Sequence, residues 1–169
     1  MSQPAATGKR SLSQPANSQF VTLGIDREIF AVGVEHVHEI LDMRSISRIP
    51  NAPGYLMGMI DVRSRTVPVV DLRVRLGLPA IEATTSTRIV VLDVRVGAVE
   101  MSLGLLADRV YEVTDLSEHA LEPPPEIGIR WNSSYIKGVG RRGGSFVIVL
   151  DLENLFASDE AALLGNMVA

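Results

Sequence analysis

The chain has 169 residues, of which 46% are hydrophobic and 21% are charged, and its net charge is −4 at pH 7. These values are typical of one globular domain or of two small packed halves. They disfavour nucleic acid as a partner, because phosphate binding needs clustered Lys and Arg. The absence of cysteine excludes thiol nucleophiles, disulfides and cysteine-ligated zinc, and it is typical of a reducing cytoplasm.

Residues 1–18 are rich in Ser, Gln, Pro and Ala, which predicts a disordered N-terminal arm. Lys9 and Arg10 are not followed by an apolar stretch, so this segment is not a signal peptide. The apolar runs farther along the chain are much shorter than the ~20 residues of a membrane-spanning helix. We therefore expect a cytoplasmic protein with no direct membrane insertion.

From Gln19 onward, short apolar and β-branched runs alternate with turns, which predicts many strands and favours a barrel or a sandwich. The predicted strands are Phe20–Leu23, Ile29–Val34, Val37–Leu41, Met57–Val62, Val67–Val70, Arg88–Val94, Val99–Leu105, Arg109–Val113, Ile136–Val139 and Phe146–Leu150. Hairpin turns are expected at Gly24–Glu28, Arg95–Ala98 and Arg142–Ser145. Capping side chains predict three short helices: Leu72–Leu76 after Asp71, Leu152–Ala157 after Asp151, and a C-terminal helix within a helix and tail of residues 158–169.

An internal repeat is the most informative feature of the sequence. Tyr55–Met59 (YLMGM) is echoed by Tyr135–Val139 (YIKGV), and an Asp-Leu pair follows sixteen residues after each tyrosine. A weaker echo links Val37–Ile40 with Val110–Val113. The matching offsets predict a duplicated unit of about five strands.

The two predicted units run from about residue 19 to 80 and from about 86 to 157. Each unit would have a small core of its own, and the apolar faces left over must meet or be covered. We therefore expect a groove between the two units.

The search for reaction chemistry is mostly negative. His36 and His38 would share one strand face and, with Glu35 or Glu39, could hold a metal, but no third ligand stands at a familiar spacing, and two solvated or packing histidines explain them better. The carboxylates Asp93, Asp108, Glu112 and Asp115 are best explained as solvated strand ends, and the sequence has no G-x-S-x-G, G-x-G-x-x-G or P-loop motif. We predict no catalytic, cofactor or metal site.

Arg63 is a candidate binding residue beside the expected groove. It stands at the tip of a predicted hairpin, with Glu39 on a nearby strand, and it could bind a carboxylate or a partner's backbone or remain a solvated charge. On the strand around Val37 and Ile40, alternate residues must face the core. The others would be exposed apolar positions suited to a partner's helix.

Several motifs together resemble the CheW family of bacterial chemotaxis coupling proteins. They are Val37-x-Glu39-Ile40, Arg48-Ile49-Pro50-Asn51-Ala52-Pro53, Gly58-Met59-Ile60-Asp61-Val62-Arg63-Ser64, Val67-Pro68-Val69-Val70-Asp71-Leu72-Arg73, Gly104–Val110, Tyr135-Ile136-x-Gly138-Val139 and Leu150-Asp151-Leu152. The resemblance covers about residues 19 to 157. It implies a mainly β fold of two intertwined five-stranded SH3-like barrels, with short helices after the closing strands.

The resemblance also implies a function. Proteins of this family are non-enzymatic scaffolds that need no cofactor and couple the cytoplasmic tips of methyl-accepting chemotaxis receptors to the histidine kinase CheA, whose regulatory domain is itself CheW-like. The expected location is the cytoplasm, with recruitment to membrane-bound receptor arrays. The positions that match the family's receptor contact are Val37, Glu39, Ile40 and Arg63.

The sequence departs from the family pattern at this contact, because it has Asp61-Val62-Arg63-Ser64 where the family has Asn-Leu-Arg-Gly. A serine in place of glycine raises the energy of a turn that needs φ > 0. The alternatives are a small nucleic-acid-binding barrel, although the few aromatic residues are scattered, another interaction module, a small β-rich enzyme, and a CheW-like part of a larger kinase or receiver-fused protein. The ends of the chain favour a stand-alone protein.

Overall fold

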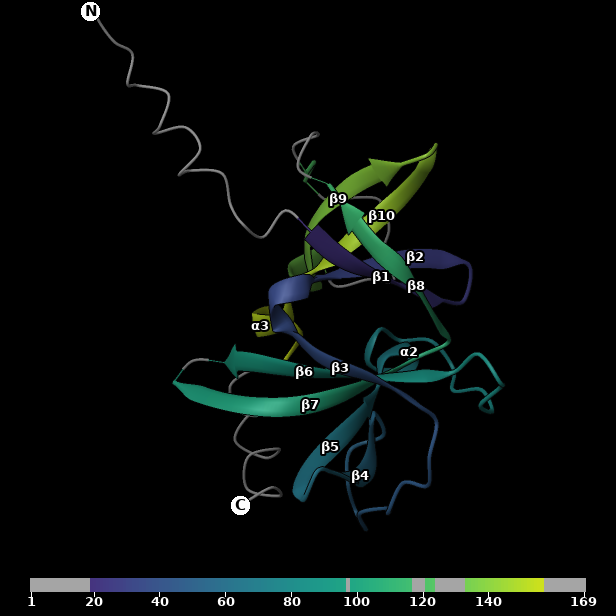
Figure 1. Cartoon of the computed structure of the whole chain (residues 1–169), viewed down its shortest axis with the longest axis vertical. Helices are drawn as coiled ribbons and strands as arrows, with labels where there is room; N and C mark the ends of the chain where they lie inside the picture. The colour runs from purple at the N-terminus through teal and green to yellow at the C-terminus, as the bar shows by residue number, and fades with distance from the viewer. Residues whose placement is uncertain (1–18, 97, 117–120, 124–132, 157–169) are drawn as a thin grey trace, which may run out of the picture.

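The computed structural model describes residues 19–96, 98–116, 121–123 and 133–156, which form two stacked five-stranded sheets (Figure 1). Sheet one has the strand order β3 (Val37–Asp42), β6 (Arg88–Val96), β7 (Val99–Ala107), β5 (Arg65–Asp71), β4 (Leu56–Val62). Sheet two has the order β8 (Arg109–Asp115), β1 (Gln19–Ile25), β2 (Glu28–Gly33), β10 (Ser145–Leu150), β9 (Ile136–Arg142). The short helices are η1 (Val34–His36), α2 (Leu72–Arg75), η2 (Ser133–Tyr135) and α3 (Leu152–Leu155).

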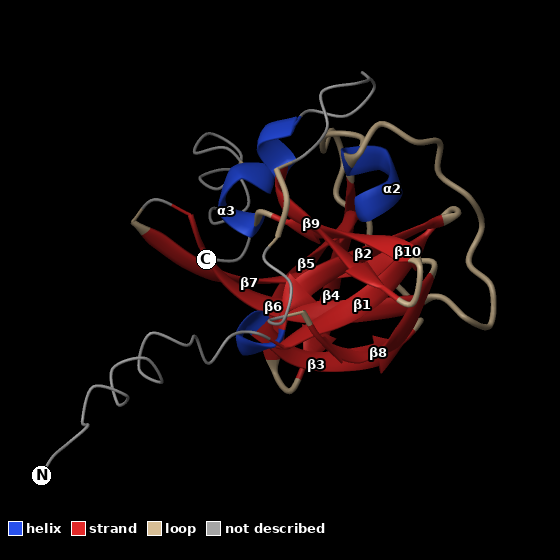
Figure 2. Ribbon diagram, turned by 90° about the horizontal axis from the view of Figure 1, so that it is seen from above, coloured by secondary structure: helices blue, strands red, loops and turns tan. Residues whose placement is uncertain are grey.

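This architecture confirms the predicted fold class, with two intertwined five-stranded SH3-like units and short helices after the closing strands. The helices α2 and α3 lie on one side of the molecule, and the edge strands β3 and β8 lie on the opposite side (Figure 2). The predicted arm of residues 1–18 and the predicted helix and tail of residues 158–169 lie outside the described residues. Within the part of the chain that the structure describes, no helix is long and apolar enough to cross a membrane.

The two halves of the chain exchange strands. β1 and β2 pair with β8 and β10 in sheet two, while β6 and β7 pair with β3 and β5 in sheet one. The two sheets do not coincide with the ranges of about 19–80 and about 86–157 expected for the two units. Sheet two combines β1 and β2 of the first half with β8, β9 and β10 of the second, and sheet one combines β6 and β7 of the second half with β3, β4 and β5 of the first. The cause is local: η1 turns the chain from sheet two into sheet one, and Asp108 alone separates β7 from β8 at the return crossing.

The internal repeat is confirmed by equivalent contacts in the two halves. The amide of Asp71 donates to the carbonyl of Tyr55, and the amide of Asp151 donates to that of Tyr135, each at 2.8 Å. Both aspartates then cap a short helix, as predicted: the Asp71 carboxylate accepts a hydrogen bond from a backbone amide of α2, and the Asp151 carboxylate accepts one from a backbone amide of α3.

A glycine in β4, and an equivalent glycine in β9, lets a neighbouring segment of the chain approach the strand closely. The segment follows β3 in the first half and β8 in the second. In sheet one, Ser47 and Met59 exchange backbone hydrogen bonds of 2.8 and 2.9 Å. A Cβ atom on Gly58 would lie 2.0 Å from the Ser47 carbonyl oxygen, and the φ of Gly58 is +153°. The equivalent bridge in sheet two joins Glu122 and Val139, next to Gly138. The repeated glycine of the sequence motif is therefore required by the close approach of the neighbouring segment, through the Ser47 carbonyl at Gly58 and through Leu121 at Gly138.

The hydrophobic core has three parts. A small cluster packs on one face of each sheet, around Val67, Val69 and Val91 in sheet one and around Ala31, Val147 and Val149 in sheet two. A larger shared core lies between the sheets and takes side chains from β1, β2, β6, β7, α2 and α3. The apolar faces left over by the two units therefore meet and bury each other, as the duplication predicts.

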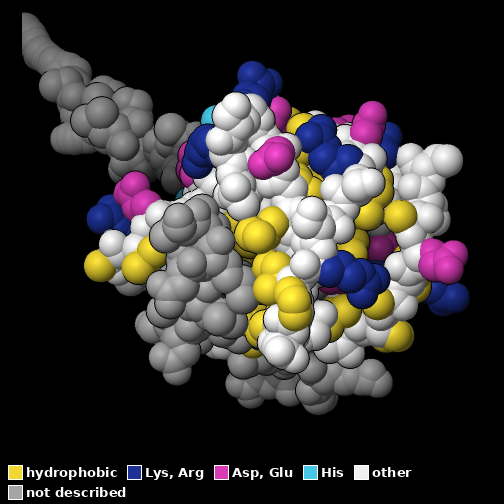
Figure 3. Space-filling model, turned by 90° about the horizontal axis from the view of Figure 1, so that it is seen from below, with side chains coloured by type: hydrophobic (Ala, Val, Ile, Leu, Met, Phe, Trp, Pro, Cys, Tyr) yellow, Lys and Arg dark blue, Asp and Glu magenta, His cyan; other side chains and the backbone are white. Residues whose placement is uncertain are grey.

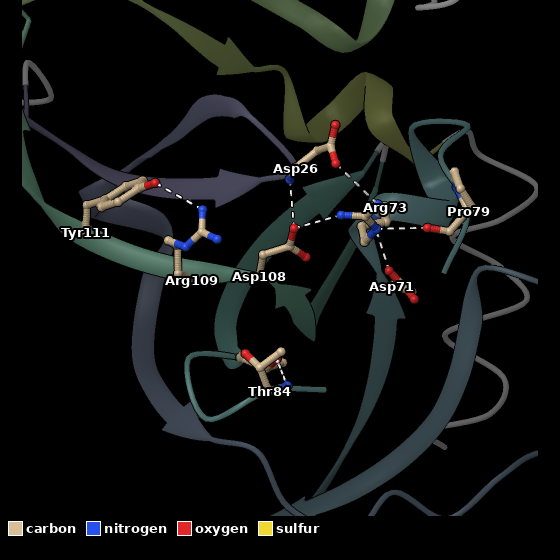
Figure 4. A network of polar contacts seen from close by, with 9 residues as sticks. Asp26, Asp71, Arg73, Pro79, Thr84, Asp108, Arg109 and Tyr111 are labelled. Atoms are coloured by element: carbon tan, nitrogen blue, oxygen red, sulfur yellow. Dashed lines mark hydrogen bonds and ion pairs between the residues drawn. The ribbon is translucent and has the colours of Figure 1, made fainter. Parts of the chain in front are cut away.

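Arg73 on α2 is a buried arginine that connects segments of both sheets (Figure 4). Its Nη1 donates to Oδ2 of Asp108 at 2.7 Å and its Nε to the Pro79 carbonyl at 2.8 Å, and the Asp26 amide donates to the same Asp108 oxygen at 2.7 Å. Asp108 is thus no solvated strand end, because it lies at the crossing from β7 to β8 with its side chain only 13% exposed. Burial raises the pKa of the neighbouring Asp71 carboxyl, and amide hydrogen bonds such as that from Arg73 oppose the rise.

Arg75 makes a second connection where the equivalent parts of the repeat face each other. Its guanidinium lies 4.8 Å from the ring centre of Tyr55 and 5.1 Å from that of Tyr135, the two tyrosines that mark the repeat. It also donates to the carbonyl of Leu155 at 2.8 Å from Nε and 2.6 Å from Nη2. Leu155 occupies the position in the second half that Arg75 occupies in the first. The single Arg75 side chain therefore makes contacts with both halves of the repeat.

Candidate functional site

The edge strand β3 carries three of the four predicted contact residues, and it presents them to different surroundings. Its pairing with β6 shifts between Val37 and Glu39, which leaves His38 as the extra residue of a bulge. Glu39 lies opposite Val91, so its side chain is on the face of the sheet that carries the sheet-one cluster. Val37 packs against the shared core, whereas the side chain of Ile40 is 42% exposed.

Arg63 and Glu39 are brought together, as the sequence predicts. Nη2 of Arg63 donates to Oε1 of Glu39 at 3.3 Å, with the arginine side chain 77% exposed and the glutamate 19% exposed. The second oxygen, Oε2, is buried and has no hydrogen-bond partner among the described residues. Arg63 is therefore a solvent-facing cation whose guanidinium makes one contact within the described residues, to Glu39.

The turn that carries Arg63 is strained. Arg63 has φ = 51° and Ser64 has φ = 69°, so both central residues of this two-residue hairpin loop adopt the left-handed region. The expectation that serine occupies a φ > 0 position here is confirmed. In the equivalent loop of sheet two the same conformation is built from Gly143 and Gly144, at φ = 56° and 85°.

A chain of polar contacts extends from this turn across the end of sheet one. Nη2 of Arg65 donates to the Ser102 hydroxyl at 2.6 Å, and that hydroxyl donates to Oδ1 of Asp93 at 2.7 Å. Nδ1 of His38 lies 3.4 Å from Oδ2 of Asp93. His38, Arg65 and Ser102, together with Arg63, surround a small hollow. The rest of its lining is formed by Val62, Val67 and Val91. We refer to it below as the arginine hollow.

Sequence reasoning assigned a binding role to Arg63 and not to Arg65, and it missed Ser102 and the pairing of His38 with Asp93. Figure 3 shows the sheet-one end of the molecule, where hydrophobic side chains reach the surface next to basic ones.

The other histidine weighed as a metal ligand, His36, lies 3.4 Å from Glu35. Within the part of the chain that the structure describes, His, Cys, Asp and Glu side chains form no group of three or more that could hold a metal.

Edge strand β8 of sheet two repeats several features of β3. Val110 packs against the shared core, as Val37 does, and Val113 is 54% exposed at the position equivalent to Ile40. Glu112 is paired with Arg142 of the β9–β10 hairpin, much as Glu39 is paired with Arg63. The echo of Val37–Ile40 in Val110–Val113 is the sequence signal that could have identified this second set.

The edge strands β3 and β8 therefore each carry apolar residues at the surface, and we refer to these residues together as the apolar margin. Both strands lie on the side of the molecule away from α2 and α3 (Figure 2), and each carries a partly buried valine that packs against the shared core. The margin consists of Val37, Ile40, Val110 and Val113. Such a surface can bury apolar side chains of a partner, with the Arg63–Glu39 pair at one end to orient it.

Comparison with known proteins gives one consistent family. A family model described as a CheW-like domain matches residues 19–160. The chain is 32% identical over 155 residues to a chemotaxis protein CheW of Treponema pallidum, covering 88% of each chain, and 27% identical to one of Klebsiella aerogenes, covering 96% of this chain and 95% of that one. It also resembles the crystal structure of a scaffolding protein CheW from Thermoanaerobacter tengcongensis, with a TM-score of 0.76, 26% identity, and coverage of 89% and 95%.

Proposed function

The chain belongs to the CheW-like family of chemotaxis scaffold proteins, and on that basis we propose that it couples the cytoplasmic tips of chemotaxis receptors to the histidine kinase CheA. In this proposal it acts by binding alone, without catalysis and without a cofactor. It works in the cytoplasm at membrane-bound receptor arrays, where it positions the regulatory domain of CheA beside the receptors.

The observation that carries this proposal is the apolar margin of β3 and β8 with an exposed arginine at its end. Ile40 and Val113 offer apolar area on two edge strands that flank the shared core, a geometry suited to the apolar face of a helix. Arg63 contacts Glu39 in the middle of β3 and is largely open to solvent. Apolar contacts would supply the affinity and the charged pair the register.

The proposal keeps Val37, Glu39, Ile40 and Arg63 as the receptor-contact residues, with different roles. Ile40 and Arg63 contact the receptor directly, because both are exposed. Glu39 acts by orienting the arginine, since its own side chain is mostly buried. Val37 supports the strand from below through its packing on the shared core.

The test is reconstitution of the full chain with CheA and a receptor cytoplasmic fragment, with kinase autophosphorylation as the readout. We expect Arg63→Ala to keep the native circular dichroism spectrum and thermal midpoint but to lose receptor control of the kinase. Arg95→Ala is the matched control, because Arg95 is also an exposed, singly paired arginine, on the β6–β7 hairpin. Unchanged receptor control in the Arg63 variant would contradict the site assignment.

A further inference from the structure

The arginine hollow is built to receive an anion. Its polar lining consists of Arg63, Arg65, His38 and Ser102, none of which is acidic. The nearest carboxylates, Glu39 and Asp93, lie outside the lining and are engaged with lining residues: Glu39 accepts from Arg63, and Asp93 accepts from Ser102 and lies beside His38. They therefore hold the donors in place without occupying the space between them.

Both guanidiniums have donors to spare. Arginine carries five N–H donors, and the contacts within the described residues use one from Arg63 and one from Arg65, both through Nη2. Arg63 occupies the two-residue turn and Arg65 is the first residue after it, so the positions of both are set by the hairpin that carries them. Two nearby guanidiniums can bind one carboxylate with charge-assisted hydrogen bonds.

The floor and size of the hollow select the kind of anion. Val62, Val67 and Val91 form the floor, and all three are buried. The hollow has a volume of about 40 Å³, room for a few water molecules at roughly 10–15 Å³ each. A carboxylate on a short methylene stem fits such a space, since its stem contacts the valines while its oxygens face the arginines.

We propose that the arginine hollow binds an aspartate or glutamate side chain of the receptor's helical tip. This inference rests on the proposed function, because it names the chemical group that the receptor presents at the Arg63 end of the apolar margin. The carboxylate replaces water in the hollow and bridges Arg63 and Arg65, while apolar residues of the same helix cover Ile40. The hollow thereby sets which way along the margin the helix runs.

The first experiment uses the full chain alone, with ¹⁵N-labelled arginine and sodium propionate as the probe. We expect the Nε–Hε signals of Arg63 and Arg65 to shift in a saturable manner with propionate, and to shift little with propionamide, which has the same shape and no charge. The Arg95 signal is the internal reference for non-specific ion pairing. Equal responses to propionate and propionamide, or responses no larger than that of Arg95, would overturn the inference.

The second experiment measures binding of the receptor cytoplasmic fragment. We expect Arg65→Gln to weaken binding at least tenfold, and Arg63→Glu with Arg65→Glu to abolish it until one acidic residue of the receptor tip is changed to lysine. If Arg63→Ala leaves receptor coupling intact, the proposed function of this site fails. If Arg63→Ala abolishes coupling but no charge reversal restores binding, the carboxylate inference fails and the proposed function stands.

Discussion

The strained turn at Arg63 and Ser64 makes a quantitative prediction about stability. Both residues adopt φ > 0, which costs a non-glycine residue roughly 1–2 kcal/mol. Glycine removes that cost but loses about 0.5–1 kcal/mol more conformational entropy on folding. We therefore expect Ser64→Gly to raise the free energy of unfolding by about 0.5–1 kcal/mol, and the melting temperature by about 2–4 °C per kcal/mol for a chain of this size.

The equivalent turn in sheet two supplies the reverse experiment within the same protein. Gly144 has φ = 85°, and a Cβ atom placed on it would meet nothing within 4 Å, so Gly144→Ser introduces backbone strain without a steric clash. We expect this change to lower the free energy of unfolding by a similar amount, about 0.5–1 kcal/mol.

Urea denaturation followed by far-ultraviolet circular dichroism measures both changes. The midpoint should move up for Ser64→Gly and down for Gly144→Ser, with the slope m unchanged. Midpoints that move in the same direction, or a Ser64→Gly variant that is less stable than the parent chain, would show that backbone strain does not control the energy of these turns.

Three further predictions concern the packed parts of the fold. Gly58→Ala should cost about 2–3 kcal/mol in urea denaturation, because the new Cβ would lie 2.0 Å from the Ser47 carbonyl oxygen and break the bridge. Arg73→Met should cost about 3–5 kcal/mol by leaving the mostly buried Asp108 carboxylate without its cation, and Asp108→Asn added to it should recover part of the loss in the same assay. Burial raises the pKa of Asp71 above its ordinary 3.8, so its contribution to stability is full below pH 3.8 and is lost as the pH rises through the raised value. Asp71→Asn should abolish that decline in a pH series of thermal unfolding, and an unchanged decline would contradict the assignment.

The repeat and the local elements were predictable because their signals are short-range. The spacing between Tyr55 and Asp71, and between Tyr135 and Asp151, predicts a hairpin and a capped helix in each half. This prediction does not depend on contacts with the other half. The exchange of strands was not predictable from periodicity, because the alternation of core-facing and outward-facing side chains along β1 is the same whichever sheet the strand joins. What decides it is the three-residue turn η1 after β2, which carries the chain into the other sheet.

The candidate site was predictable in part for a similar reason. Glu39 and Arg63 match a known pattern, and their proximity follows from it. The contact between Arg65 and Ser102 depends on the register of a parallel β5–β7 pair formed between the two halves, which the sequence does not reveal. The buried position of Asp108 has the same origin, because it follows from the crossing between sheets and not from the residues beside it.

The difference between the two hairpins connects the strain with the proposed binding site. Both halves pair a glutamate of the third repeat strand with an arginine of the following hairpin, as Glu39 with Arg63 and Glu112 with Arg142. In sheet two the arginine precedes a Gly-Gly turn and is free of strain, whereas in sheet one Arg63 occupies the strained turn itself. Because the Gly-Gly turn shows that the fold does not require this strain, the cost at Arg63 and Ser64 is best explained by the position that it gives the guanidinium, beside Arg65 at the arginine hollow.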